Sequence, residues 1–150
     1  MTREEKLKKI VADPVLWCRC FCNIVDKTGR KVKFEPTYHQ KLLVKNFGKY
    51  NIVAKARQLG VTSLAIAYSL YLTHTRPDTV CMLMSYSLDT VDIVFKKLKA
   101  MYDDLDPSVK IKDVANNRKE LILENRSRIM CCVCGSKDQA RGATIRYAHL

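Results

Sequence analysis

Residues 50–63 read YNIVAKARQLGVTS, and this stretch decides the fold. It begins with the strand-forming residues Tyr50, Ile52 and Val53, passes through Gly60, and runs into the apolar segment LAIAYSLYL. Aromatic and β-branched residues favour strands, and a long apolar segment is typical of a buried helix. The pattern predicts a strand over 50–56, a turn, and a helix from about Gly60 to Thr73.

A strand–turn–helix of this kind can form a phosphate-binding loop, in which backbone N–H groups and the positive helix end face the phosphates. On the template G-x-x-x-x-G-K-[ST], Lys55 stands at the first glycine, Gly60 at the second, Val61 at the lysine and Thr62 at the hydroxyl position. By spacing alone, an ordinary strand that enters a helix through one glycine is the better interpretation.

Two features of the loop favour ligand binding. Lys55 and Arg57 place two cations in the turn, where they are candidate replacements for the charge that Val61 lacks. Thr62 lies where the first helical turn begins, which suits a hydroxyl that faces Mg²⁺. Ser63 follows as a further hydroxyl of the same turn.

The flanking sequence predicts strands that alternate with helices. We expect helices over 3–12, 37–46 and 87–105, the last with Ser87 as its cap, a buried strand over 79–85 and a final strand over 143–150. Hairpins are expected over 17–34, with a turn at 26–29, and over 120–136, with a turn at Asn125-Arg126. Strand–helix–strand units predict a mostly parallel sheet with crossover helices and added antiparallel hairpins.

The seven cysteines fall in two groups and one single position. Cys18, Cys20 and Cys22 alternate, three cluster at 131–134, and Cys81 stands alone. Four of them could supply a zinc site, but their strand-like spacing favours buried free thiols. The odd number and the lack of an export signal predict a reducing cytoplasm.

The net charge of +12 predicts a polyanionic partner such as nucleic acid. No apolar run reaches the roughly 18 residues that a membrane span needs, so no membrane partner is expected. The three histidines, at 39, 74 and 149, share no metal-like spacing, and the lysine-rich run at 96–99 is typical of a solvated helix face.

Three segments resemble the large terminase subunit of tailed bacteriophages, the ATPase that drives DNA into the procapsid. KARQLGVTS at 55–63 is similar to that family's deviant Walker A loop, and FEPTYHQKLL at 34–43 is similar to its adenine-recognising segment, with Gln40 as the glutamine. GSKDQARGATIRYAHL at 135–150 resembles the stretch that leads into Walker B. The likeness covers roughly residues 15–150.

The resemblance implies a P-loop NTPase-like α/β fold whose cofactors are ATP and Mg²⁺. It implies adenine contact by Gln40 and metal contact by Thr62, and it makes Arg57 the catalytic cation, with Lys55 as the rival for the γ-phosphate. The residues implied to contact the nucleotide are Gln40, Lys55, Arg57, Gln58, Gly60, Val61, Thr62 and Ser63.

For the whole protein, the resemblance implies double-stranded DNA, a portal protein and a small terminase subunit as partners, self-association, and action in the host cytoplasm. Residues 1–150 are expected to be a partial ATPase domain, with a helix and hairpin at 1–35 and a nucleotide-binding core at 36–150. Because the Walker B carboxylates would follow Leu150, we expect nucleotide binding without appreciable hydrolysis. The alternatives are a helicase-like P-loop ATPase and a basic nucleic-acid-binding module without a nucleotide site.

Overall fold

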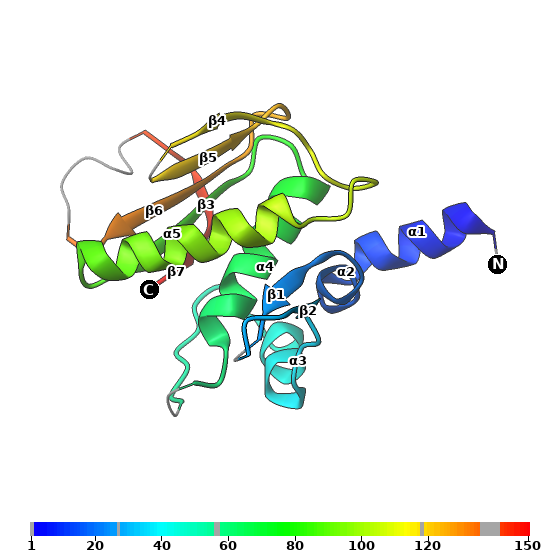
Figure 1. Ribbon diagram of the computed structural model, residues 1–150, viewed down its shortest axis with the longest axis horizontal. Helices are drawn as coiled ribbons and strands as arrows, with labels where there is room; N and C mark the ends of the chain where they lie inside the picture. The colour runs from blue at the N-terminus through cyan, green and yellow to red at the C-terminus, as the bar shows by residue number, and fades with distance from the viewer. Residues whose placement is uncertain (1, 27, 56–57, 118, 136–141) are drawn as a thin grey trace.

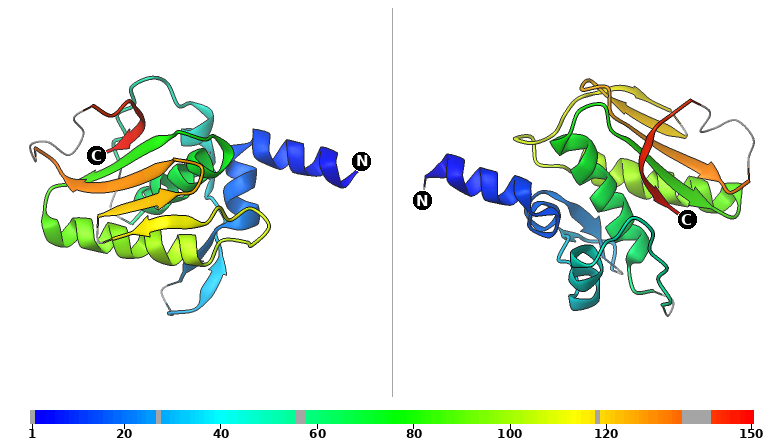
Figure 2. Two further views of the ribbon diagram at one scale, coloured as in Figure 1. Left: turned by 90° about the horizontal axis from the view of Figure 1, so that it is seen from above. Right: turned by 180° about the vertical axis from the view of Figure 1, so that it is seen from behind.

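The structure is a computed structural model that describes residues 2–26, 28–55, 58–117, 119–135 and 142–150. It is an α/β protein in which α1 extends away from the other elements (Figures 1 and 2). In chain order the elements are α1 (Arg3–Ala12), α2 (Pro14–Phe21), β1 (Asn23–Val25), β2 (Lys31–Lys33), α3 (Tyr38–Lys45), α4 (Val61–Thr75), β3 (Val80–Ser85), α5 (Leu88–Asp103), β4 (Asp113–Asn116), β5 (Glu120–Leu123), β6 (Arg128–Val133) and β7 (Ile145–His149).

The main sheet has five strands in the order β4–β5–β6–β3–β7. β3 pairs in parallel with both β6 and β7, whereas β4, β5 and β6 pair antiparallel. The register of β3 and β6 runs from Val80 opposite Arg128 to Ser85 opposite Val133. The α/β class and the combination of parallel strands with an antiparallel hairpin are confirmed, but the sheet is mixed rather than mostly parallel.

The core lies between the sheet and helices α2, α4 and α5. Ile66 of α4, Leu83 of β3 and Leu98 of α5 are buried together with Trp17 of α2. Complete burial of such a side chain contributes about 1.5–3 kcal/mol. Because strand residues alternate between faces, Met82 and its neighbours Met130 and Cys132 form a second, smaller cluster on the other face of the sheet.

The hairpin predicted over 17–34 is only partly correct, because its first half is the helix α2. Asp13 caps this helix by accepting hydrogen bonds from the N–H groups of Val15 and Leu16, and Pro14 occupies its first turn. Trp17 and Phe21, four residues apart, are both buried. The alternating cysteines therefore belong to a helical pattern, and only β1 and β2 form the hairpin, with its turn where expected.

The strand predicted over 50–56 is absent from its described residues, 50–55. Tyr50 is 85% exposed and Ile52 is fully exposed. Strand propensity is realised only where a neighbouring strand and a buried face are available. Here the Asn51 amide bonds to the backbone N–H and C=O of Gly48 at 2.9 and 3.1 Å, so local side-chain contacts take the place of a ladder.

The remaining predicted elements are confirmed within a few residues, namely α1, α3, α4, β3, α5, the β5–β6 hairpin and β7. Ser87 caps α5 by accepting from the N–H of Thr90, as its position predicted. Strand β4 was not predicted. Asp113–Asn116 is a four-residue segment with a polar residue at each end, and it forms a strand because it pairs with the edge of β5.

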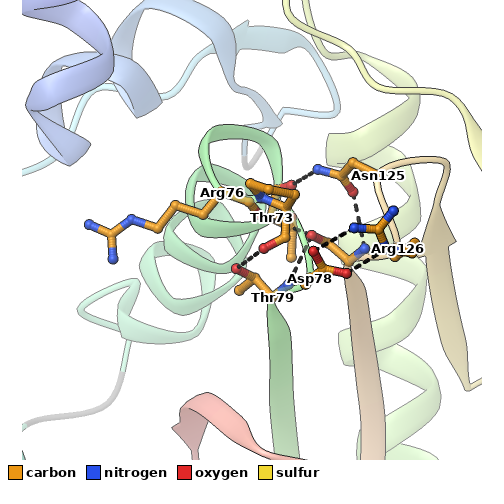
Figure 3. A network of polar contacts seen from close by, with 8 residues as sticks. Thr73, Arg76, Asp78, Thr79, Asn125 and Arg126 are labelled. Atoms are coloured by element: carbon orange, nitrogen blue, oxygen red, sulfur yellow. Dashed lines mark hydrogen bonds and ion pairs between the residues drawn. The ribbon is translucent and has the colours of Figure 1, made fainter.

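Buried polar contacts fix the end of α4 against the start of β3 and the β5–β6 turn (Figure 3). The Asn125 amide donates to the carbonyl of Thr73 at 2.7 Å, and the Ser127 hydroxyl donates to the carbonyl of Arg76 at 3.0 Å. The same hydroxyl accepts from the N–H of Thr79 at 3.1 Å. These bonds satisfy backbone groups that the helix end and the strand start would otherwise leave unpaired.

An ion pair lies at the surface of this network. Arg126 donates to both carboxylate oxygens of Asp78, at 2.6 and 2.7 Å. The hydrogen bonds from Arg126 lower the pKa of Asp78 below its ordinary value. Both side chains are more than half exposed, so solvent screens the pair and its contribution to stability is small.

Candidate functional site

The start of α4 differs from the starts of the other described helices. Gly60 is its N-cap, with left-handed backbone angles of φ 68° and ψ 20°, and no side chain caps it within the described residues. By contrast, Thr2, Asp13, Thr37 and Ser87 cap α1, α2, α3 and α5. The first N–H groups of a helix lack helical partners and carry the positive end of the dipole, so α4 presents its donors to the loop before it.

Gln40 joins this helix start to the start of α3. Its Nε2 donates to the carbonyls of Leu59 and Gly60 at 3.1 and 3.0 Å, and its Oε1 accepts from the N–H of Thr37 at 2.9 Å. The Thr37 hydroxyl accepts from the N–H of Gln40 in return, which completes a capping box. Gln40 is only 4% exposed, so this amide is a buried connection between the two helices.

A hollow of about 270 Å³ opens beside this connection. Its volume is slightly below the range typical of small-molecule sites. The hollow lies between the β1–β2 hairpin, α3, the loop before α4 and the first turn of α4. Its lining consists of Ile24, Phe34, Glu35, Thr37, His39, Gln40, Gln58, Leu59, Gly60 and Ser63.

Four of the predicted nucleotide-contacting residues meet at this hollow, namely Gln40, Gln58, Gly60 and Ser63. Val61 and Thr62 are half-buried in the first turn of α4 and do not line it. Arg57, the predicted catalytic residue, lies outside the described residues.

Lys55 is exposed and does not line the hollow. It is close enough to β7 to act on His149, whose pKa is lowered chiefly by burial and further by the charge of Lys55. One predicted cation therefore lies near the carboxyl end of β7, which is also the carboxyl end of its parallel neighbour β3. Ligands of α/β sheets commonly bind at this end of the strands.

A second hollow of about 180 Å³ lies between β1, α4 and α5. It shares Ile24 and Ser63 with the first, so these two side chains stand between the hollows. Asn23 at its rim donates to the backbone carbonyl of Asp104 at 2.8 Å, and Lys31 is ion-paired with the Asp104 carboxylate. The side chains of Asn23 and Asp104 at this hollow are thus engaged in contacts within the protein.

Within the described part of the chain, no group of three or more His, Cys, Asp or Glu side chains is arranged to hold a metal ion. The described cysteines are free thiols, and Cys18, Cys22, Cys81, Cys131 and Cys132 are buried. Burial raises the pKa of Cys81 and of Cys131 to about 12, which keeps both as neutral thiols. Buried thiols were expected, although Cys18 is buried in a helix rather than in the predicted strand.

Sequence reasoning missed Glu35 and His39 as lining residues. Glu35 is the one carboxylate on the described lining, and it is ion-paired with Arg19 at 2.9 Å and with Lys41 at 3.4 Å. A signal for the Gln40 connection was present, because Thr37-x-x-Gln40 has the capping-box spacing. No comparable signal marked Glu35, which stood out only as the residue before Pro36.

A scan against protein-family models matched no family, and a search of curated proteins found no match. Among the described residues, no helix has the length and apolar character needed to cross a membrane.

Proposed function

We propose that this chain is the nucleotide-binding part of a P-loop ATPase of the terminase large-subunit type, and that the hollow before α4 binds the phosphates of ATP with Mg²⁺. The observation that carries the proposal is the uncapped start of α4 beside that hollow. Gly60, Gln58 and Ser63 line it, so an anion there would meet open backbone donors and a hydroxyl.

The order of elements supports the same function. Helix α4 follows the loop and leads to β3, and α5 follows β3, so two helices pack against the parallel strands. In the proposed site, Lys55 supplies long-range positive charge from the β7 side, and Ser63 supplies the hydroxyl for Mg²⁺ in place of the expected Thr62, which does not line the hollow. Glu35, the one acid on the described lining, is already ion-paired. We therefore expect nucleotide binding without appreciable turnover.

By the same resemblance, the whole protein would couple ATP hydrolysis to the movement of double-stranded DNA into procapsids, in contact with a portal protein and a small terminase subunit. Positioning and charge stabilisation carry most phosphoryl transfer, which fits a site built from backbone donors and cations.

The test is calorimetric titration of the chain with ATP–Mg²⁺. Gly60→Ala is the informative variant, because its new Cβ would lie 2.8 Å from Gln40 Nε2 and its φ of +68° is strained for any L side chain. We expect Gly60→Ala to abolish the binding heat and Lys55→Ala to reduce it. Lys99→Ala, an exposed lysine of α5, is the charge-matched control for Lys55→Ala and should bind as wild type does. Equal heats in all four proteins would refute the assignment.

A second candidate function is a basic nucleic-acid-binding module without a nucleotide site, which the net charge of +12 favours. Fluorescence anisotropy with labelled duplex DNA at several salt concentrations would measure it. Binding through phosphate contacts loses about 0.9 log units of affinity per contact for each decade of salt. DNA affinity that is independent of ATP–Mg²⁺, together with no calorimetric heat, would favour this candidate over the ATPase.

A further inference from the structure

Gln40 has every polar group of its amide engaged inside the protein. Its Nε2 carries two hydrogens and donates to two carbonyls, and its Oε1 accepts one backbone N–H. An amide that reads an adenine edge must instead offer one donor and one acceptor to the base. With the side chain 4% exposed and both Nε2 hydrogens used, Gln40 has no donor left to give.

The two carbonyls that accept from Gln40 belong to Leu59 and Gly60, the last two residues before α4. The carbonyl of Gly60 accepts from Gln40 and also accepts the first helical bond of α4, from the N–H of Leu64 at 3.0 Å. The peptide that carries this carbonyl therefore belongs both to the left-handed turn and to the helix start. Holding it in place fixes the direction in which the free N–H groups of α4 point.

The close approach of Gln40 also accounts for the residue type at 60. A Cβ at this position would lie 2.8 Å from Nε2, closer than real Cβ contacts come. Glycine at position 60 therefore allows both the positive φ and the close contact with Gln40.

We infer, on the basis of the proposed function, that Gln40 is a positioning residue that orients the phosphate-binding turn and that it does not recognise the base. Gln40 contributes to nucleotide affinity only through the phosphates. Its loss weakens every ligand that carries a triphosphate by the same factor, whatever base is attached.

The test compares ATP, GTP and inorganic tripolyphosphate, each with Mg²⁺, on wild type and Gln40→Met. Methionine keeps the length and volume of the side chain and removes the three amide hydrogen bonds. Two of these hold the loop and are worth about 1 kcal/mol each, so we expect roughly tenfold or greater weakening, equal for the three ligands. Weakening of ATP alone, with GTP and tripolyphosphate unaffected, would show adenine recognition and overturn the inference.

Glu5→Met is the matched control. Glu5 occupies the same capping-box position in α1, where its carboxylate accepts from the N–H of Thr2 at 2.8 Å, and the only side-chain hydrogen bonds described for it are within that box. The variant loses a helix cap without touching the loop, so triphosphate affinity should stay at the wild-type level. A loss equal to that of Gln40→Met would reduce the role of Gln40 to general stability and overturn the inference.

Hydrogen exchange separates this inference from the proposed function. Without ligand, the backbone amide of Leu64, which donates to the Gly60 carbonyl, should exchange faster in Gln40→Met than in wild type or Glu5→Met. If wild type binds none of the three ligands, the proposed function fails, while faster exchange in Gln40→Met still supports the positioning role. Unchanged exchange at Leu64 overturns that role whatever the binding results.

Discussion

His74, near the end of α4, makes the stability of the fold depend on pH. Its Nδ1 lies 2.8 Å from the carbonyl of Leu70 and donates to it, while its buried Nε2 has no hydrogen-bond partner among the described residues. The rings of Trp17 and Tyr102 flank it at 5.9 and 6.1 Å. Burial lowers the pKa of His74 from 6.5 to about 4, with a further lowering by the charge of Lys110 that is opposed by the bond to Leu70.

The sign and size of the effect follow from linkage. Between pH 6.5 and 4, the unfolded chain protonates at His74 and the folded chain does not, so stability falls as pH falls through this window. The full contribution is present above pH 6.5. The fall in the pKa of His74 from 6.5 to about 4 corresponds to roughly 3 kcal/mol, most of which is lost by about pH 4.5. That is a large part of the 5–15 kcal/mol typical of a domain.

The assay is urea unfolding at pH 7.5 and pH 4.5 of wild type, His74→Phe and His39→Phe. His74→Phe keeps an aromatic ring between Trp17 and Tyr102 and cannot be protonated, so its loss of stability on acidification should be roughly 2–3 kcal/mol smaller than that of wild type. His39→Phe, at an exposed position of α3, should keep the wild-type dependence. Carboxylates titrate in all three proteins and cancel in the comparison. An equal loss in wild type and His74→Phe would show that the buried ring does not control the acid transition.

Two further predictions concern the network at the end of α4 and the thiols. Ser127→Ala should lower the free energy of unfolding by about 1–3 kcal/mol in urea titrations, because it leaves buried backbone groups unpaired. Arg126→Met should lower the free energy of unfolding much less than Ser127→Ala does, since it removes only an exposed ion pair, and an equal cost for both variants would contradict this ranking. At pH 8, a thiol reagent should label exposed Cys134 rapidly, whereas Cys81 and Cys131 should react only after urea unfolding. Rapid labelling of Cys81 in the native protein would contradict its burial.

Local signals in the sequence predicted the elements that are stabilised locally. The cap at Ser87, the turn at Asn125-Arg126 and the apolar strand before Ser85 each depend on neighbours in the chain, and each is confirmed. The strand predicted over 50–56 is not formed in residues 50–55, because a strand needs a partner edge, which no local pattern supplies. The strand predicted from the cysteines at 18–22 is wrong because local helix signals were overlooked. Their i, i+2 spacing fits a strand, but Asp13 and Pro14 start a helix just before them.

The sequence predicted the position of the candidate site better than it predicted the hydrogen bonds within it. Gly60 before an apolar helix marks the turn from sequence alone. Gln58 and Ser63 are near it in the chain, and all three line the hollow. The contact between Gln40 and Gly60 joins residues 20 apart in the chain, and it depends on where α3 packs. Adenine recognition and loop positioning both need an amide at Gln40. The residue type therefore supports both roles, and only the partners of the amide distinguish them.

The two ends of α4 are built in opposite ways, and this contrast bears on function. At its end, Asn125 and Ser127 bind carbonyls of the last turn and of the connection to β3, so protein groups satisfy the backbone. At its start, Gln40 binds carbonyls, and no side chain of the described residues caps the first N–H groups. Because unsatisfied donors are costly when buried, an open start is tolerable only beside solvent or a ligand, and the hollow provides that space. A chain that needed α4 for packing alone would gain about 1 kcal/mol from a Ser or Asp at the N-cap. Glycine forgoes that gain, and the left-handed turn that it permits is what lets Gln40 reach the loop.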